Sequence, residues 1–224
     1  MRNKLLVDVD GTITSLSNYV DVLQGIIKKA VMDSGVDISG WDVWKIYNAF
    51  LASDYADNVK KMKILGIDPE VFWNRIAKED YNEREKHYGK TIKLYDDVSI
   101  LRGMAQNGFE MGILTDQPNI LAKRYVEIFN LDFFREMVCG NYMSELSKPG
   151  IVGAKLLMDR LGATTDNSIM IGDSDIDIIT AKRLGIPVIQ IKRDGELDYG
   201  PQEPDAVIKT FHELPEAIKK VSKK

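Results

Sequence analysis

The chain has 224 residues, of which 44% are hydrophobic and 29% are charged, as in an ordinary soluble globular protein. Its formal net charge of −4 predicts no general attraction to nucleic acid or to an anionic membrane. The single cysteine, Cys139, excludes an internal disulfide, and we expect neither a signal peptide nor a membrane span, so these features favour a reducing cytoplasm.

The first predicted element is an apolar strand, Leu5–Val9, that runs into the sequence Asp8-Val9-Asp10-Gly11-Thr12. Carboxylates are costly where a hydrophobic strand ends unless something compensates their charge, and Mg²⁺ is the obvious compensator because it takes oxygen ligands. An aspartate beside such a cation can also act as a nucleophile and form an aspartyl-phosphate. Gly11 lets the chain turn sharply and bring backbone N–H groups close to an anion. The alternative is a strand followed by an acidic turn, since Asp-Gly is a common turn dipeptide.

Residues from about 15 to 95 contain no convincing strand. Four stretches have the spacing of amphipathic helices, namely Ser17–Met32, Asp42–Leu51, Asp54–Leu65 and Pro69–His87. We expect a helical insert here that acts as a lid and excludes water, the alternative being a bundle with no catalytic part. Aromatic residues in helices are more often packing residues, but several side chains could line a substrate pocket: Tyr19, Trp41, Trp44, Tyr47, Asn48 and Tyr55.

The second predicted strand, Phe109–Leu114, is followed by Thr115 and Asp116. A hydroxyl at this point can donate to a phosphate oxygen. It could equally cap the helix that follows, and the two roles are compatible. Further along, Asn119 could reach a substrate, although helix capping explains it as well. Cys139 near a weaker strand is expected to be a small core residue rather than a reactive thiol.

Lys148 and Pro149 are predicted to begin the next helix, which continues to Gly162. The helix macrodipole normally disfavours a cation at a helix N-terminus. A lysine there makes sense if an anion is shared between it and the helix end, and the alternative is an exposed lysine in a loop.

A third apolar strand, Ser168–Ile171, is followed by three acidic residues in the sequence Gly172-Asp173-Ser174-Asp175-Ile176-Asp177. Asp173 matches Asp8, because each follows a strand, and two such carboxylates can share one Mg²⁺. The helix from Asp175 to Leu184 begins here, and acids in a first turn are ordinary dipole complements. Asp175 is the acid that we most readily assign to capping.

Strands and helices alternate along the chain, with further strands predicted at Pro187–Gln190 and Ala206–Ile208. This pattern favours an α/β fold with a Rossmann-like parallel sheet, in which ligands bind at the carboxyl ends of the strands. We expect residues 1–14 and 95–224 to form this core and residues 15–94 to form an inserted α-helical domain.

Taken in chain order, these four motifs resemble those of the haloacid dehalogenase-like superfamily. The matching pieces are Asp8-Val9-Asp10-Gly11-Thr12, Leu114-Thr115, Lys148-Pro149 and Gly172-Asp173-Ser174-Asp175-Ile176-Asp177. The helical insert resembles the α-helical (C1) cap of that family's phosphatases, and the layout is similar to that of phosphoglycolate phosphatases.

The resemblance implies a Mg²⁺-dependent phosphatase that hydrolyses a small-molecule phosphate monoester. Asp8 would be the nucleophile, and Asp10 would protonate the leaving alcohol and then activate water. The implied phosphate-binding residues are Gly11, Thr115, Asp116 and Lys148. The implied metal ligands are the Asp8 carboxylate, the Asp10 backbone carbonyl, Asp173 and, directly or through water, Asp177.

Several other readings stay open. A phosphosugar mutase would keep both aspartates and the helical cap. A dehalogenase or a phosphonate hydrolase would lack the acid two residues after the nucleophile, and Asp10 stands there. A non-catalytic binding protein would have a broken motif, and all four are intact. The phosphate ester itself and the oligomeric state are not specified, because a two-carbon acid phosphate, a sugar phosphate and a nucleotide need the same core.

Overall fold

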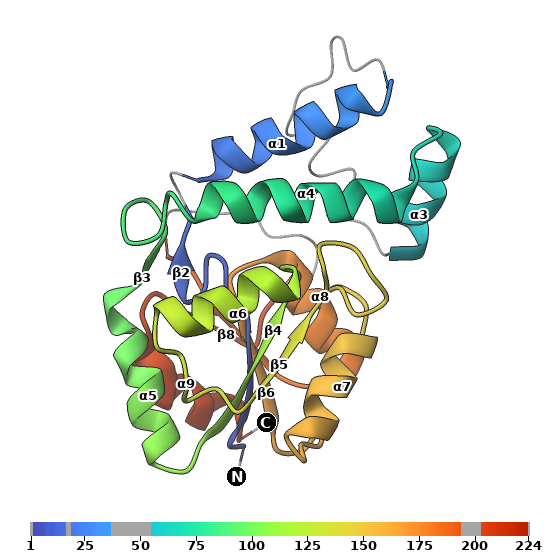
Figure 1. Ribbon diagram of the computed structural model, residues 1–224. Coiled ribbons are helices and arrows are strands. Elements are labelled where there is room, and N and C mark those ends of the chain that lie inside the picture. Colours follow the sequence, from blue (N-terminus) through green and yellow to red (C-terminus); the bar gives the residue numbers. More distant parts are fainter. Residues whose placement is uncertain (1, 17–18, 37–54, 194–202, 224) are drawn as a thin grey trace.

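The computed structural model describes all residues except 1, 17–18, 37–54, 194–202 and 224 (Figure 1). Its centre is a sheet of six parallel strands in the order β5-β4-β1-β6-β7-β8. The strands are β1 (Lys4–Val7), β4 (Glu110–Thr115), β5 (Glu136–Cys139), β6 (Ser168–Gly172), β7 (Val188–Ile191) and β8 (Ala206–Ile208). Counted along the chain within this sheet, the order is that of the Rossmann fold, so the predicted α/β class is confirmed.

Helices cover both faces of the sheet, which explains why its strands read as continuous apolar runs. On one face, Leu6 packs with α7 (Val152–Arg160) and α8 (Asp175–Leu184). On the other, Leu5 and Val7 belong to the core that includes α5 (Ser99–Gln106), α6 (Asn119–Ile128) and α9 (Leu214–Val221). Two single-turn 3₁₀ helices, η1 (Asp96–Val98) and η2 (Phe211–Glu213), precede α5 and α9.

Three helices form a separate layer beyond the carboxyl ends of the strands (Figure 1). They are α1 (Val20–Asp33), α3 (Tyr55–Ile64) and α4 (Pro69–Arg84), and α4 packs against both others. The Asp68 side chain caps α4 by accepting the Val71 N–H, with Pro69 in the first helical position. The helix predicted at Asp42–Leu51 lies outside the described residues.

A short antiparallel pair, β2 (Thr14–Ser15) and β3 (Lys93–Leu94), joins this helical layer to the sheet. The expectation of no strand between residues 15 and 95 is therefore wrong at its two ends. Two residues are too few to show an alternating pattern, and the strands form because the chain leaves and returns side by side. The ranges 1–14 with 95–224 and 15–94 stay a prediction of the domain boundaries.

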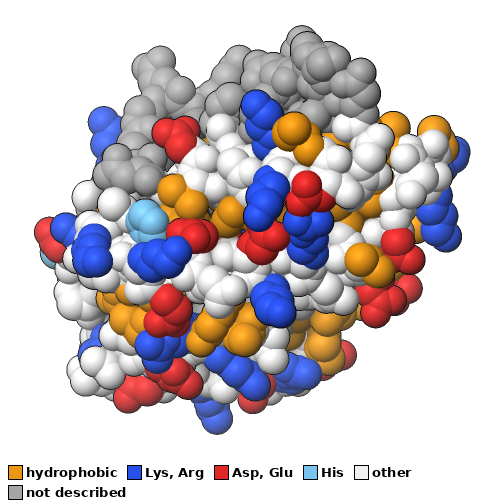
Figure 2. All heavy atoms as spheres, turned by 45° about the horizontal axis from the view of Figure 1, so that its top comes forward, with side chains coloured by type: hydrophobic (Ala, Val, Ile, Leu, Met, Phe, Trp, Pro, Cys, Tyr) orange, Lys and Arg blue, Asp and Glu red, His pale blue; other side chains and the backbone are white. Residues whose placement is uncertain are grey.

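Figure 2 shows the face that carries the helical layer, where cationic and anionic side chains are interspersed. Exposed ion pairs such as Lys86 with Glu83 lie within α4 and just beyond its end. Among the described residues, we find no helix that is both long enough and apolar enough to cross a bilayer.

Candidate active site

Asp8 lies directly beyond the central strand of the sheet. In-register pairing puts Val7 level with Ile113 of β4 and Ile171 of β6, so the residues that follow these strands emerge at one edge. The chain leaves β4 toward one side of the sheet and β6 toward the other. The residues after β1 therefore lie at the switch point, where open α/β sheets form their ligand crevice.

A buried lysine joins two of the predicted acidic residues. Lys148 Nζ lies 2.6 Å from Asp8 Oδ1 and 2.7 Å from Asp177 Oδ1, and all three side chains are almost fully buried. Buried charges are tolerated when they are paired and hydrogen-bonded, and each of these charges has an opposite partner. The three residues come from three separate segments, so tertiary folding brings them together.

Burial shifts the pKa values of this group. Desolvation raises the pKa of Asp8 well above its ordinary value, although the Lys148 cation opposes the shift. Desolvation alone would lower the pKa of Lys148, but Asp177, Asp8 and Asp116 more than offset it, so the ammonium stays charged. Lys148 therefore brings a permanent positive charge to the Asp8 carboxylate.

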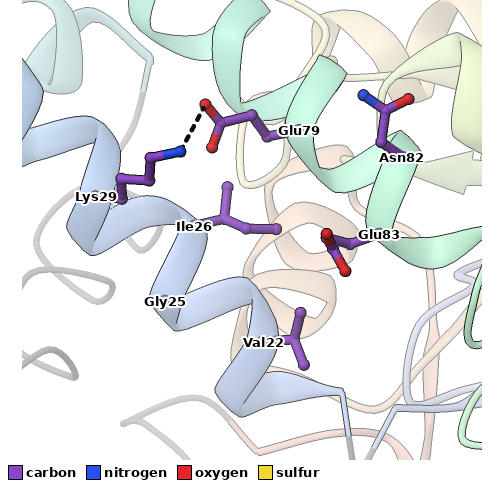
Figure 3. A pocket seen from close by; sticks show the side chains of 7 residues that line it. All are labelled: Val22, Gly25, Ile26, Lys29, Glu79, Asn82 and Glu83. Atoms are coloured by element: carbon purple, nitrogen blue, oxygen red, sulfur yellow. Dashed lines mark ion pairs between the residues drawn. The ribbon is translucent and has the colours of Figure 1, made fainter.

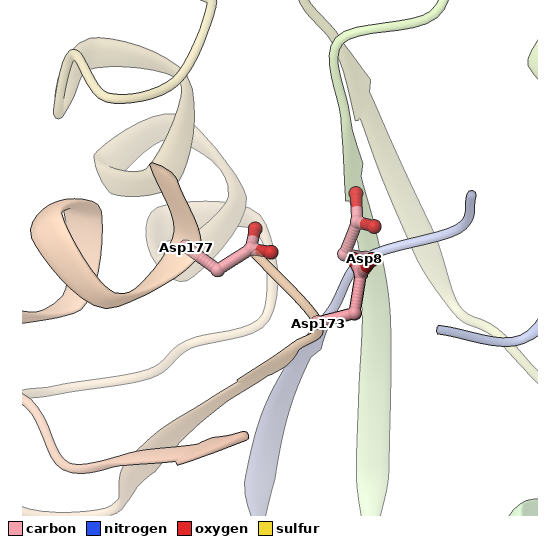
Figure 4. Close-up of side chains that lie close together, drawn as sticks. All are labelled: Asp8, Asp173 and Asp177. Carbon is pink, nitrogen blue, oxygen red and sulfur yellow. The ribbon is translucent and has the colours of Figure 1, made fainter. Parts of the chain in front are cut away.

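Asp8, Asp173 and Asp177 bring three carboxylates to one place (Figure 4). One oxygen atom from each lies within 4.8 Å of the others. The Thr12 hydroxyl bridges Asp8 and Asp173 at 3.4 and 3.3 Å. Burial, together with the charge of Asp177, raises the pKa of Asp173 to about 7, so the cluster is short of positive charge. A set of carboxylate oxygens of this kind suits a hard divalent cation such as Mg²⁺.

Gly11 makes room for this cluster. Its φ of +83° lies in the left-handed region that favours glycine, and a Cβ there would fall 2.2 Å from Asp173 Oδ2. Its N–H donates to the Thr14 carbonyl at 2.8 Å. Gly11 therefore contributes the turn and the space, while its amide is engaged within the turn itself.

The Asp10 side chain lies apart from the other three carboxylates. Its Oδ2 accepts from the Gln117 amide, and its Oδ1 accepts from the Tyr125 and Thr14 hydroxyls, each at 3.2 Å. Arg84 Nη1, from the end of α4, lies 3.6 Å from Oδ1. Burial and the charge of Asp10 raise the pKa of Tyr125 well above its ordinary value, so that hydroxyl stays protonated.

Thr115 and Asp116 also lie at this edge of the sheet. The Thr115 hydroxyl is buried and accepts the Gln117 N–H at 3.2 Å. It does not cap α6, because Pro118 is in that position. Asp116 Oδ1 accepts the Lys148 N–H at 2.8 Å, which ties the loop after β4 to the loop that carries the lysine.

One local prediction at the site is wrong, and a second is incomplete. Lys148 does not begin a helix, since α7 starts at Val152 and the Lys148–Pro149 peptide bond is cis. Lys148 lies in a loop. Its ammonium group pairs with the Asp8 and Asp177 carboxylates and not with an anion bound at a helix N-terminus. Asp175 lies in the first turn of α8, as expected of an acid that complements the helix dipole, but Asp177 makes the capping-box contacts. Asp177 accepts from the Ser174 N–H at 3.1 Å and from the Ser174 hydroxyl at 2.7 Å, and thereby closes the first turn.

The remaining candidates have diverse surroundings. Tyr19 is fully buried and donates to Asp80, and Tyr55 is 37% exposed. Cys139 is partly buried, and burial raises the pKa of its thiol to about 11, which agrees with an inert side chain. Asn119 Oδ1 lies 3.9 Å from the Cys139 sulfur. Trp41, Trp44, Tyr47 and Asn48 lie outside the described residues.

A hollow of about 410 Å³ lies between α1 and α4 (Figure 3). Its lining includes Val22 and Ile26 of α1 and Glu79 and Glu83 of α4, with Lys29 3.9 Å from Glu79. None of the carboxylates at the sheet edge lines it, so this hollow is separate from the candidate active site.

Several side chains that contact the aspartates were not predicted to do so, among them Thr12, Thr14, Gln117, Tyr125 and Arg84. Thr12 stands in the first motif but was given no role. Tyr125 and Arg84 come from helices, and both reach Asp10. The one available signal for Arg84 was an acid four residues before it, Asp80, and such pairs are common on solvated helices.

A sequence profile described as haloacid dehalogenase-like hydrolase matches residues 5–191. The chain belongs to this family. The expected family and hydrolase class are thus confirmed.

Relatives and solved structures agree with this assignment. A glyceraldehyde 3-phosphate phosphatase of Methanocaldococcus jannaschii is 24% identical across the whole of both chains. A phosphoglycolate phosphatase of Aquifex aeolicus is 22% identical, over 81% of this chain and 80% of that protein. The solved structure of a hydrolase from Pseudomonas syringae superimposes with a TM-score of 0.73 at 19% identity, covering 98% of this chain and 99% of that one.

The same fold also occurs in a proposed beta-phosphoglucomutase of Thermotoga maritima. Its TM-score is 0.61 at 17% identity, and the match covers 98% of this chain and 99% of that one. A likeness at this identity shows the fold alone. The names of the two relatives above agree with the expected class of phosphoric monoester hydrolase.

Proposed function

We propose that the chain is a Mg²⁺-dependent phosphatase that hydrolyses a small phosphate monoester through an aspartyl-phosphate on Asp8. The observation that carries this proposal is the Asp8 carboxylate, buried at the switch point of the sheet and held by Lys148 at 2.6 Å. A carboxylate attacks a phosphate dianion only if nearby cations offset their repulsion, and Lys148 supplies one such charge.

The residues present fit a divalent cation. The clustered carboxylates of Asp8 and Asp173 would hold it, with Asp177 acting directly or through water. The Asp10 backbone carbonyl would complete the protein ligands. A bound Mg²⁺ would neutralise charge on the phosphoryl group. Lys148 and Thr115 would hold phosphoryl oxygens beside it. Asp116, which accepts the Lys148 N–H, would keep the lysine loop in place.

The first chemical step is attack by an Asp8 carboxylate oxygen on phosphorus. A P–O bond to Asp8 forms, the P–O bond to the substrate alcohol breaks, and the Asp10 carboxyl gives its proton to the leaving oxygen. Asp10 is then ionised and takes a proton from water as the water oxygen attacks phosphorus. Asp8 leaves as a carboxylate and inorganic phosphate is released, so both aspartates return to their starting states.

The helical layer, α1, α3 and α4, would shield this chemistry from bulk water. Arg84 at the end of α4 already reaches Asp10, so this layer lies over the acid side of the site. The substrate class that we propose is a small-molecule phosphate ester, in line with the names of the two relatives.

A phosphate-release screen with and without Mg²⁺ tests the proposal. The panel should contain phosphoglycolate, glyceraldehyde 3-phosphate, a nucleoside monophosphate and β-glucose 1-phosphate. We expect metal-dependent phosphate release from at least one of them and none with Asp8→Asn. Conversion of the sugar phosphate to glucose 6-phosphate without phosphate release would indicate a mutase instead.

Trapping the intermediate tests the nucleophile directly. Acid quenching during turnover followed by borohydride should reduce an acyl phosphate at Asp8 to homoserine, which mass spectrometry of the peptide detects. Asp8→Asn serves as the matched control, since it lacks the attacking carboxylate. Full turnover by Asp8→Asn on every ester would remove Asp8 from this role.

A further inference from the structure

Arg84 is the last residue of α4 and is 1% exposed. A buried guanidinium is costly unless its charge is paired. Its Nε lies 2.9 Å from Asp80 Oδ2 and 3.1 Å from Asp80 Oδ1. Its Nη1 donates to the Tyr125 hydroxyl and lies 3.6 Å from Asp10 Oδ1. One side chain therefore contacts its own helix with one nitrogen and the sheet domain with another.

Asp80 holds the inner half of this side chain in place. It is fully buried, and besides Arg84 it accepts from the hydroxyls of Tyr19 and Tyr142. The Arg84 guanidinium also lies over the Tyr19 ring, 5.0 Å from its centroid. Because Asp80 and Arg84 are four residues apart on one helix, their bond persists wherever α4 lies.

The contacts of Arg84 with Asp10 and Tyr125 cross from α4 to the sheet domain, as does the contact of Asp80 with Tyr142. Asp10 is the least buried of the site's ion-paired aspartates, with 26% of its side chain exposed. Its other donors, Thr14 and Gln117, come from β2 and from the loop after β4. Arg84 supplies the one contact to Asp10 from the described part of the helical layer.

We propose that Arg84 is a positioning residue for the Asp10 carboxylate, so that proton donation to the leaving oxygen requires α4 to lie against the sheet edge. This inference rests on the proposed function, in which Asp10 is the acid. Arg84 touches neither phosphorus nor the leaving oxygen in this account. It acts by fixing where the Asp10 carboxylate stands, with Asp80 as its anchor.

The choice of leaving group separates such a role from general damage. An alkoxide is a strong base and needs a proton as it departs, whereas 4-nitrophenolate departs without one. The ratio kcat/KM covers the steps up to departure of the alcohol, so it reports this proton transfer and excludes later hydrolysis of the intermediate.

The experiment measures kcat/KM for 4-nitrophenyl phosphate and for the alkyl phosphate that the unaltered protein hydrolyses fastest. For Arg84→Met we expect about a 100-fold fall on the alkyl ester, the size of a misplaced acid, and a fall of less than about threefold on the aryl ester. Arg84→Lys keeps the positive charge, but a lysine cannot bridge Asp80 and Asp10. For this variant we expect kcat/KM to fall about tenfold on the alkyl ester and to stay unchanged on the aryl ester.

Two further variants guard the interpretation. Asp80 anchors Arg84 and is not itself proposed to contact Asp10. Asp80→Asn should therefore weaken the anchor and lower kcat/KM selectively on the alkyl ester, by less than Arg84→Met does. Arg75→Met is the matched control, because Arg75 pairs with Glu79 at the same spacing on the same helix but keeps 37% of its side chain exposed. We expect it to leave both values of kcat/KM unchanged. Thermal unfolding of each variant shows whether it folds.

Equal losses on the two esters by folded Arg84→Lys and Asp80→Asn would overturn the inference, as would no loss on either. Asp10→Asn in the same assay keeps this failure distinct from failure of the proposed function. If Asp10→Asn shows no preference for the aryl ester, the acid role of Asp10 is wrong. If Asp10→Asn is selective and the Arg84 variants are not, only the positioning role of Arg84 is wrong.

Discussion

Asp8 and Asp10 are two residues apart, yet they lie in contrasting surroundings. Asp8 is buried, and Lys148 pairs with it from a loop at the sheet edge. Asp10 keeps 26% of its side chain exposed and is contacted by Tyr125 of α6 and Arg84 of α4. The strand ends at Val7 and the chain turns at Gly11, so the two side chains do not share one face as alternate strand residues would.

This contrast divides the proposed reaction between two parts of the molecule. The proposed attacking carboxylate and metal site depend on the sheet edge, where Asp8 and Asp173 directly follow strands and buried ion pairs hold Lys148. The acid depends on contacts between two layers, which can change when one layer moves against the other. Changes near Asp8 should therefore affect every substrate, and changes near Asp10 should depend on the leaving group.

Replacing Lys148 by methionine should give the largest effect. The substitution removes the cation from Asp8 and Asp177 and leaves two buried carboxylates together. We expect phosphate release to fall at least about 100-fold on aryl and alkyl esters alike, because charge stabilisation at the reacting centre is lost. The free energy of unfolding should fall by about 3–5 kcal/mol at pH 8, the usual cost of breaking a buried pair.

The pH dependence of that stability loss distinguishes charge from packing. Without Lys148, burial keeps the folded-state pKa of Asp8 raised, so the folded form binds protons more tightly than the unfolded form. The deficit should therefore shrink as pH falls from 8 toward 5. Denaturant unfolding at the two pH values measures it, and an equal deficit at both would mean that lost packing, not charge, causes the instability.

The affinity for Mg²⁺ should depend on pH near neutrality. This effect also concerns the Asp8 side of the site and should be smaller than that of Lys148→Met. Asp173 has a pKa of about 7, raised by burial, and a proton on it competes with the metal. Below pH 7 the apparent affinity should rise about tenfold per pH unit, and the rise should level off above about pH 8. Calorimetric titration at pH 6, 7 and 8 measures this, with Asp173→Asn expected to bind weakly and with a reduced slope. A flat profile for the unaltered protein would contradict the role of Asp173.

The sequence was sufficient to predict the Asp8 side of this comparison. An apolar run that ends in acids occurs at both Asp8 and Asp173, and a parallel sheet brings such ends together. Lys148 was identified, but its local structure was not. The proline after it suggested a helix start, whereas Gly150 and Ile151 still belong to the loop before α7 begins at Val152.

The Asp10 side could not be predicted in the same way. On α4, Arg75 with Glu79 and Asp80 with Arg84 are both acid–base pairs four residues apart. The first pair is partly exposed, whereas the second is buried and its arginine lies against Asp10. Local spacing is the same in both, and only the packing of α4 on the sheet edge separates a solvated pair from one at the site.

Asp116→Asn should give the smallest effect. Burial raises the pKa of Asp116 to about 6, although Lys148 opposes the shift. The folded protein therefore holds this proton more tightly than the unfolded chain, and ionisation of Asp116 costs stability as pH rises from about 4 to about 6. The asparagine keeps an oxygen that can accept the Lys148 N–H but carries no charge.

Relative to the unaltered protein, Asp116→Asn should thus gain stability across that interval, by on the order of 1–2 kcal/mol, and then hold a constant difference at higher pH. Denaturant midpoints at pH 4.5 and 7.0 measure the gain. Taking the difference between the two proteins cancels the titration of groups that they share. The same difference at both pH values would mean that Asp116 is ionised throughout, and that the sheet edge next to Lys148 tolerates one more negative charge than its burial predicts.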